Sequence, residues 1–205
     1  MKCVIAGLVV GLSVVVAAGN AYAQEGSPGP GKVEVTIIPA GWRFFQAHDN
    51  GPGFDNYDVG GAFAYNFTRM FGVEGEVGGS FGLTQDLDLR VPNTTIHETS
   101  PNMLSYVGNV VVNMPVSSVT PYVTGGAGGL TLYEREVVGI NDSDTFFTSN
   151  VGAGVKWYAP NNRWGLRGDY RLQFVNSKDD APEFFGQASR WGQRIYGGVV
   201  LNVVK

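Results

Sequence analysis

Residues 164 to 174, WGLRGDYRLQF, alternate between apolar and polar positions with the period of two that is typical of a β-strand. A half-buried strand of a soluble sandwich also alternates, so this segment alone does not decide which face meets water. One face carries Trp164, Leu166, Gly168, Tyr170, Leu172 and Phe174, and the other carries Gly165, Arg167, Asp169, Arg171 and Gln173.

The pattern recurs, and it predicts eight strands in all. The other seven are residues 33–45, 57–67, 71–84, 103–114, 119–133, 146–157 and 194–204. The first of them alternates poorly around Ile37, Ile38 and Pro39, which predicts a β-bulge. Four glycines blur the period of residues 119–133 and predict strong bending there.

The connections between these strands alternate in length. Short ones are expected at residues 68–70, 115–118 and 158–163, and long polar ones at 46–56, 85–102, 134–145 and 175–193. Short turns at one rim, long loops at the other and an even number of strands of about ten residues indicate an outer-membrane barrel. We therefore predict an all-β fold, an eight-stranded antiparallel transmembrane β-barrel with short periplasmic turns and long extracellular loops.

In the seven expected strands other than residues 119–133, the charged positions share one face. Because an arginine or lysine that faces lipid at the midplane costs about 2 to 4 kcal/mol, this face is expected to line the lumen. A lumen of eight strands is filled by side chains, and buried charges must be paired. The third and seventh strands lie opposite each other, so we expect Glu74 and Glu76 to meet Arg167 and Arg171. The whole predicted lumen network is Glu74, Glu76, Lys156, Arg167, Asp169, Arg171 and Arg194, and we favour a structural plug over a gate for ions.

Aromatic residues gather near the strand ends, where they are expected to form two interfacial girdles. The girdle at the short turns would contain Phe67, Phe71, Trp157, Tyr158 and Trp164. The girdle at the long loops would contain Phe44, Tyr57, Phe81, Phe147, Phe174 and Trp191.

Residues 1–23 are expected to be a signal peptide. Lys2 supplies the positive start, Val4 to Ala18 the apolar stretch, and Ala21-Tyr22-Ala23 the cleavage site. The only cysteine, Cys3, lies in this segment, so no disulfide and no thiol chemistry are expected in the mature chain. Residues 24–32, QEGSPGPGK, are expected to be a flexible lead-in, and residues 33–205 the barrel domain.

Composition changes this interpretation little. The net charge of -4 over 205 residues argues against a nucleic-acid partner. The hydrophobic share of 43% is ordinary, because half of each strand in such a barrel is polar. No sequence motif indicates a cofactor or a metal centre.

The long loops are acidic, and hydration of the outer rim explains this most simply. An alternative is divalent-cation bridging between residues 141–144 (Asn-Asp-Ser-Asp) and lipopolysaccharide, although the spacing is incomplete for a calcium loop. The two histidines, His48 beside Asp49 and His97 beside Glu98, raise the alternative of a lipid-modifying or peptide-cleaving enzyme. Loop histidines are usually solvated, so we do not expect an enzyme.

Three segments resemble the outer-membrane β-barrel domain family of OmpA-type and OmpX-type proteins. They are PYVTGGAGGLTLY (121–133), SNVGAGVKWYAPNNRWGLRGDYRLQF (149–174) and YGGVVLNVV (196–204). The resemblance implies a monomer with both termini in the periplasm, inserted by the barrel-assembly machinery among outer-membrane lipid and lipopolysaccharide. The chain stops at Lys205, so we do not expect the peptidoglycan-binding domain of full-length OmpA proteins. It also ends in Val-Val-Lys, where many relatives end in an aromatic residue.

The expected role is therefore structural or surface-interactive, in envelope integrity or adhesion, with a host or surface ligand meeting the long loops. A narrow passive channel is the alternative, and a lipid-modifying enzyme is less favoured.

Overall fold

The computed structural model describes residues 32–45, 53–88, 95–116, 118–133, 143–178 and 189–203. The expected signal peptide and residues 24–31 lie outside the described residues. Lys32, expected in the lead-in, is the first residue of β1. The strands are β1 (Lys32–Phe45), β2 (Phe54–Asn66), β3 (Phe71–Gly82), β4 (Thr84–Asp88), β5 (Thr95–Thr99), β6 (Asn102–Asn113), β7 (Val119–Tyr133), β8 (Ser143–Tyr158), β9 (Trp164–Val175) and β10 (Arg190–Asn202).

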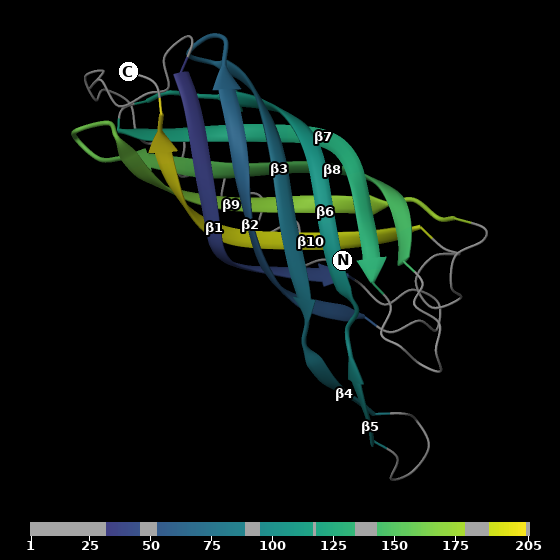
Figure 1. The fold of residues 1–205 in the computed structure, drawn as a ribbon. Helices are drawn as coiled ribbons and strands as arrows, with labels where there is room; N and C mark the ends of the chain where they lie inside the picture. The colour runs from purple at the N-terminus through teal and green to yellow at the C-terminus, as the bar shows by residue number, and fades with distance from the viewer. Residues whose placement is uncertain are drawn as a thin grey trace, which may run out of the picture.

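Eight of these strands close into an antiparallel barrel in the order β1-β10-β9-β8-β7-β6-β3-β2 (Figure 1). Because β1 pairs with both β2 and β10, the sheet closes on itself. Each barrel strand has 12 to 16 residues, which exceeds the about 9 to 11 residues that a tilted strand needs to cross hydrocarbon. The predicted eight-stranded antiparallel barrel is confirmed.

A hairpin outside the barrel was not predicted. β4 and β5 pair from Thr84 with Thr99 to Asp88 with Thr95. Thr84 was expected to end the third strand, and the rest of the hairpin lies in the long polar connection expected at residues 85–102. Figure 1 shows the hairpin extending beyond the barrel wall from the ends of β3 and β6. Its strands, TQDLD and TIHET, contain few apolar residues, so they do not show the pattern that identified the barrel strands.

β1 bends at the predicted bulge. Its register shifts between Ile37 and Ala40 against β10, and between Ile38 and Gly41 against β2. Figure 1 shows the strand turning sharply along its length. The bulge predicted around Pro39 is confirmed, and its extra residue exchanges the two faces of the strand. Even-numbered residues point inward before it and odd-numbered residues after it, so the buried side of β1 consists of Glu34, Thr36, Ile38, Gly41, Arg43 and Phe45.

The short connections are held by local hydrogen bonds. Thr68 Oγ1 accepts from the backbone N–H groups of Met70 (3.1 Å) and Phe71 (2.9 Å). Asn162 has a φ of 51°, in the left-handed region that asparagine tolerates better than most residues. Its backbone carbonyl accepts from Asn202 Nδ2 at 2.7 Å, which ties this turn to β10.

The two faces of the barrel differ in chemistry. Apolar side chains cover the outside at mid-height, and Val77, Val110, Val151 and Ile195 each expose at least half of their surface. An apolar belt of this extent fits hydrocarbon rather than water. None of the described residues belongs to a helix with the length and apolarity of a membrane span. Most charged side chains of the barrel strands point inward and are buried, which makes the lumen the candidate site.

Candidate functional site in the barrel lumen

Ten charged side chains in the lumen form a set that we call the lumen network. They come from six strands, and each exposes no more than 4% of its surface. The network consists of the acids Glu34, Asp58, Glu74, Glu76 and Asp169 and the bases Arg43, Lys156, Arg167, Arg171 and Arg194. Five negative charges and five positive charges leave it with no net charge, so each buried ion has a counterion available.

Glu74 on β3 lies at the centre of the network. Arg167 on β9 donates to both of its carboxylate oxygens, with Nη2 3.2 Å from Oε1 and a second bond from Nη1 to Oε2. Arg171 Nη2 also donates to Oε1 at 3.0 Å. A fork-shaped guanidinium that holds both oxygens fixes geometry as well as charge, so this contact is the strongest kind of protein ion pair. The structure thus brings three of the sequence-predicted residues together across the lumen.

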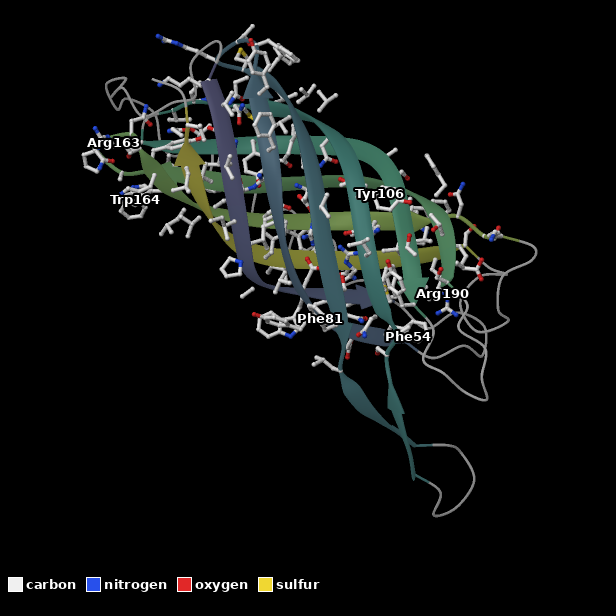
Figure 2. The ribbon with its side chains drawn as sticks, in the orientation of Figure 1. Phe54, Phe81, Tyr106, Arg163, Trp164 and Arg190 are labelled. Carbon is white, nitrogen blue, oxygen red and sulfur yellow. The ribbon has the colours of Figure 1, made fainter. Side chains whose placement is uncertain are left out.

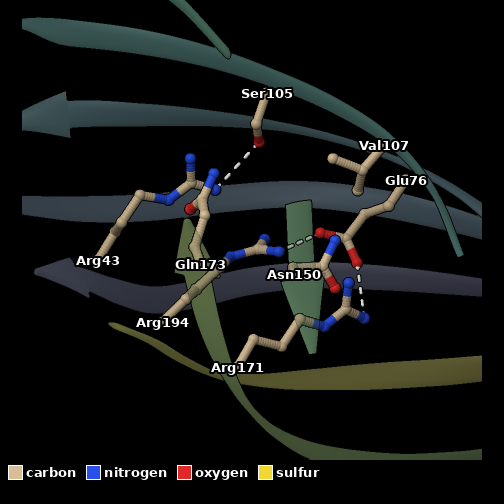
Figure 3. Close-up of a pocket in the computed structure, with 8 residues that line it drawn as sticks. All are labelled: Arg43, Glu76, Ser105, Val107, Asn150, Arg171, Gln173 and Arg194. Carbon is tan, nitrogen blue, oxygen red and sulfur yellow. Dashed lines mark hydrogen bonds and ion pairs between the residues drawn. The ribbon is translucent and has the colours of Figure 1, made fainter. Parts of the chain in front are cut away.

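Glu76 connects the centre to β10. Arg171 Nη2 lies 3.1 Å from Glu76 Oε2, and Arg194 Nη1 pairs with Oε1 (Figure 3). Arg194 Nε also donates to Asp58 Oδ2 at 2.5 Å and its guanidinium stacks 4.5 Å from the Tyr196 ring. The network therefore extends across the barrel from β9 to β2.

Asp169 holds the two central arginines in place from their own strand. Its carboxylate accepts from Arg167 Nη2 at 3.0 Å and from Arg171 Nε at 2.9 Å. The hydroxyl of Tyr122 donates to Asp169 and accepts from Arg167 Nε at 2.7 Å. Tyr122, on β7, was not among the predicted residues, because the glycines of its strand had hidden which of its residues face inward.

Lys156 forms its ion pair with a residue that was not in the predicted network. Its Nζ is 2.6 Å from Glu34 Oε2, and the hydroxyl of Tyr158 donates to Glu34 Oε1, also at 2.6 Å. Lys156 reaches the rest of the network through the Tyr122 ring, 5.4 Å from Nζ. The placement of Tyr158 in the girdle was wrong, because a residue that follows the outward-facing Trp157 must point inward.

Glu34 and Arg43 of β1 belong to the network but were not predicted. Arg43 Nη2 lies 3.3 Å from Asp58 Oδ1 and donates to Ser105 Oγ at 3.0 Å. The bulge explains why they were missed. Glu34 is even-numbered and Arg43 is odd-numbered, so a strand without a bulge would place them on opposite faces. Treating the two halves of β1 as separate strands would have identified both.

Of the predicted girdle residues, Figure 2 shows Trp164 near the turn end of the barrel and Phe81 near the loop end. Near the turns, Trp157 and Trp164 pack edge to face with centroids 5.7 Å apart, and Phe67 and Phe71 are exposed. Near the loops, Phe81 and Trp191 are exposed, and Phe174 packs against Trp191 at 5.0 Å. Tyr57 is half-buried, and its hydroxyl donates to the carbonyl of Pro39 at 2.7 Å.

The lumen is not charged along its whole length. At the loop end it holds a cluster of apolar side chains that we call the apolar cap, which consists of Phe45, Met103, Leu130, Leu132, Phe146 and Val175, with Phe54 packed against it. The expectation of a polar lumen was thus incomplete. Arg190 stacks 5.4 Å from the Phe54 ring at the edge of the cap.

The sequence hypotheses on the loops fall largely outside the described residues. His48, Asn141 and Asp142 lie outside them, and His97 lies on the β4–β5 hairpin. Asp144 Oδ1 is 2.6 Å from Lys178 Nζ, so this carboxylate already has a cation beside it. Among the described residues, no group of three or more His, Cys, Asp or Glu is placed to hold a metal ion.

Comparisons with known proteins agree with the barrel geometry. The family model described as outer membrane protein beta-barrel domain matches residues 8–199. Neisserial surface protein A is 13% identical with a TM-score of 0.57, over 83% of this chain and 95% of that one. The N-terminal β-barrel domain of Pseudomonas aeruginosa OprF is 16% identical with a TM-score of 0.51, over 85% and 99%. OprG from Pseudomonas aeruginosa is 11% identical with a TM-score of 0.51, over 90% and 100%.

These solved structures are too distant in sequence to show more than the fold. No curated protein sequence matches the chain. The family match covers most of the sequence and confirms the resemblance found in the strand and turn segments. The chain belongs to the outer membrane protein beta-barrel domain family.

Proposed function

We propose that this protein is a monomeric, closed barrel of the Gram-negative outer membrane with a structural or surface-interactive role. The observation that carries the proposal is the lumen network, which joins β3 to β9 and leaves each of its charges buried. A closed network of paired ions in a narrow barrel resists the passage of hydrated solutes. The protein would then act through its outer surface and its loops.

Two barriers in series support closure. The lumen network fills the barrel at mid-height, and the apolar cap fills the loop end, where Leu130 is fully buried. An ion would have to leave water to pass the cap and then separate strong ion pairs to pass the network. Neither barrier depends on residues outside the described part of the chain.

The proposed orientation places the short turns and both termini in the periplasm and the long loops outside. Phospholipid and lipopolysaccharide would cover the apolar belt, and the barrel-assembly machinery would insert it. A host or surface ligand would meet the loop end, where the β4–β5 hairpin extends beyond the wall. Loops and hairpins that project from a rigid scaffold are the usual place for such contacts.

Conductance of the purified protein in planar bilayers tests closure. We expect no stable open level, whereas a trimeric porin measured in the same bilayers gives steady conductance. A narrow passive channel is the second candidate, because ionised side chains line the lumen at mid-height. A stable open level of porin size would contradict the plug and favour the channel.

Growth and binding experiments separate envelope integrity from surface interaction. A deletion strain is compared with strains that carry either the full chain or a variant in which a short turn replaces residues 84–99. A ligand at the hairpin is supported if both chains restore detergent resistance but only the full chain restores surface binding.

A separate experiment tests the lipid-modifying enzyme. If the lipid A acyl pattern is retained after His48→Ala and His97→Ala, this argues against such an activity.

A further inference from the structure

Three basic side chains lie at the turn end of the barrel, and we call them the basic rim. Arg69 and Arg163 lie in the turns that follow β2 and β8, and both are exposed. Lys32 is the first residue of β1 and is half-buried. Figure 2 shows Arg163 at this end of the barrel, next to Trp164.

The basic rim has no counterion in the described part of the chain. No ion pair joins any of its three charged groups to another described residue. The acid nearest to Lys32 along β1 is Glu34, which is buried and accepts from Lys156 and Tyr158. No aspartate or glutamate occurs in the short connections, residues 67–70, 114–118 and 159–163. The rim therefore keeps a net positive charge.

The three cations lie on neighbouring strands and not scattered around the rim. Lys32 pairs with Asn66, the last residue of β2, and Arg69 lies in the turn that follows. The backbone carbonyl of Arg163 accepts from the Asn202 N–H at 3.0 Å, at the end of β10, and β10 pairs with β1. The basic rim thus follows one continuous arc over β9, β10, β1, β2 and β3.

Large apolar side chains adjoin the basic rim on the outer wall. Phe67 and Phe71 flank Arg69 along the chain and expose 51% and 50% of their surfaces. Trp164 directly follows Arg163 and is also exposed. Aromatic side chains of membrane proteins gather at the level of the lipid headgroups. The basic groups beside them are therefore placed at the level of the lipid phosphates.

We propose that the basic rim binds anionic phospholipid headgroups, such as phosphatidylglycerol, in preference to zwitterionic ones. A guanidinium group can hold two oxygens of one phosphate. A zwitterionic lipid carries its own cation beside the phosphate, so its net attraction to unpaired basic side chains is weaker. The proposal rests on the membrane setting of the proposed function, but not on a closed lumen or on a ligand at the loops.

Fluorescence quenching by brominated lipids tests the preference at each end of the barrel separately. The chain has four tryptophans. Trp42→Phe with Trp191→Phe leaves only the reporters at the turn end, and Trp157→Phe with Trp164→Phe leaves only those at the loop end. Each protein is placed in phosphatidylcholine vesicles that contain brominated phosphatidylglycerol or brominated phosphatidylcholine. We expect the turn-end reporters to show about fivefold tighter binding of phosphatidylglycerol, and the loop-end reporters to show no preference.

Substitutions of Arg163 provide the matched pair in the turn-end reporter protein. Arg163→Gln is expected to remove most of the preference, whereas Arg163→Lys keeps the charge and should retain it. Sodium chloride at about 0.5 M should weaken the preference by screening. Equal binding of the two lipids at the turn end would overturn the proposal. A preference that survives Lys32→Gln, Arg69→Gln and Arg163→Gln together would also overturn it, because the attraction would then arise elsewhere.

Peptidoglycan is the other anionic surface that such a rim could meet, since its stem peptides carry carboxylates. Sedimentation of the detergent-solubilised protein with purified sacculi measures this contact, and we expect none that depends on the three cations. Sedimentation that the triple variant abolishes, together with equal binding of the two lipids, would identify the cell wall as the partner and contradict the proposal. These results are independent of closure, which the bilayer conductance measures.

Discussion

Glu74 and Arg167 face each other from strands that are separated by three other strands in both directions around the barrel. The Arg167 guanidinium nevertheless donates to both carboxylate oxygens of Glu74, and both side chains are fully buried. Backbone hydrogen bonds join only neighbouring strands, whereas this pair joins opposite walls. It therefore stabilises the closed cross-section of the barrel.

Glu74→Gln is predicted to destabilise the barrel by about 3 to 5 kcal/mol, because it leaves Arg167 and Arg171 short of one buried counterion. Urea unfolding in lipid vesicles, followed by tryptophan fluorescence, measures the loss. Arg69→Gln, in the exposed turn between β2 and β3, is the control and should change stability by no more than about 0.5 kcal/mol.

The double variant Glu74→Gln with Arg167→Gln checks the cause of that loss. Removing both members of the pair restores charge balance, so we expect it to cost less than the sum of the single substitutions. Strict additivity would show that the two residues do not stabilise the barrel through each other.

Tyr158→Phe is predicted to lower the free energy of unfolding by about 1 to 3 kcal/mol. The change keeps the ring but removes the hydroxyl that donates to Glu34, which leaves one oxygen of a buried carboxylate unsatisfied. Tyr133→Phe, at an exposed site near the loops, is the matched control. Equal stability of the two variants would mean that the bond to Glu34 contributes nothing.

The architecture could be predicted because each strand of a membrane barrel has one face that must be apolar, where it meets lipid, and one face that can be charged, where it lines the lumen. That rule assigned β3 and β9 without ambiguity, since Glu74, Glu76, Arg167 and Arg171 all fall on the polar side. Counting strands placed β3 opposite β9. The contact between these side chains could therefore be predicted from the sequence once the sheet was assumed to close into a barrel.

The other residues that line the lumen could not be predicted from the alternation of apolar and polar positions alone. The bulge in β1 exchanges its faces, which hid Glu34 and Arg43. Glycines in β7 removed the pattern that would have placed Tyr122 inside. The apolar cap was missed because Leu130 and Leu132 lie on the inward face yet carry no polar group, so they resemble residues that face lipid.

Phe146→Ala is predicted to lower stability by about 3 to 5 kcal/mol, because Phe146 is buried in the apolar cap and its removal leaves a cavity. Phe147→Ala is the control on the adjacent, outward-facing position, where 58% of the side chain is exposed, and should lose much less. Urea unfolding measures the free energy of unfolding of both variants.

The same Phe146→Ala variant also tests which barrier closes the barrel. We expect it to show no conductance in planar bilayers, because the lumen network still fills the barrel. Steady conductance would show that the apolar cap is the main barrier.

Val151→Arg tests whether the outer wall meets hydrocarbon. Val151 lies at the middle of β8 and exposes 58% of its surface on the outer face, so an arginine there should cost about 2 to 4 kcal/mol in lipid vesicles. Thr145→Arg is the matched control, since it lies on the same face near the loop rim, where the expected cost is about 0 to 1 kcal/mol. The strand, the face and the new side chain are the same, so the two variants differ mainly in depth. Thr145→Arg also removes the hydrogen bond between the Thr145 and Thr131 hydroxyls, 2.8 Å apart, which works against the expected difference. Equal losses in lipid would show that the middle of this wall is not in hydrocarbon, which would remove the physical reason for placing the ionised side chains inside.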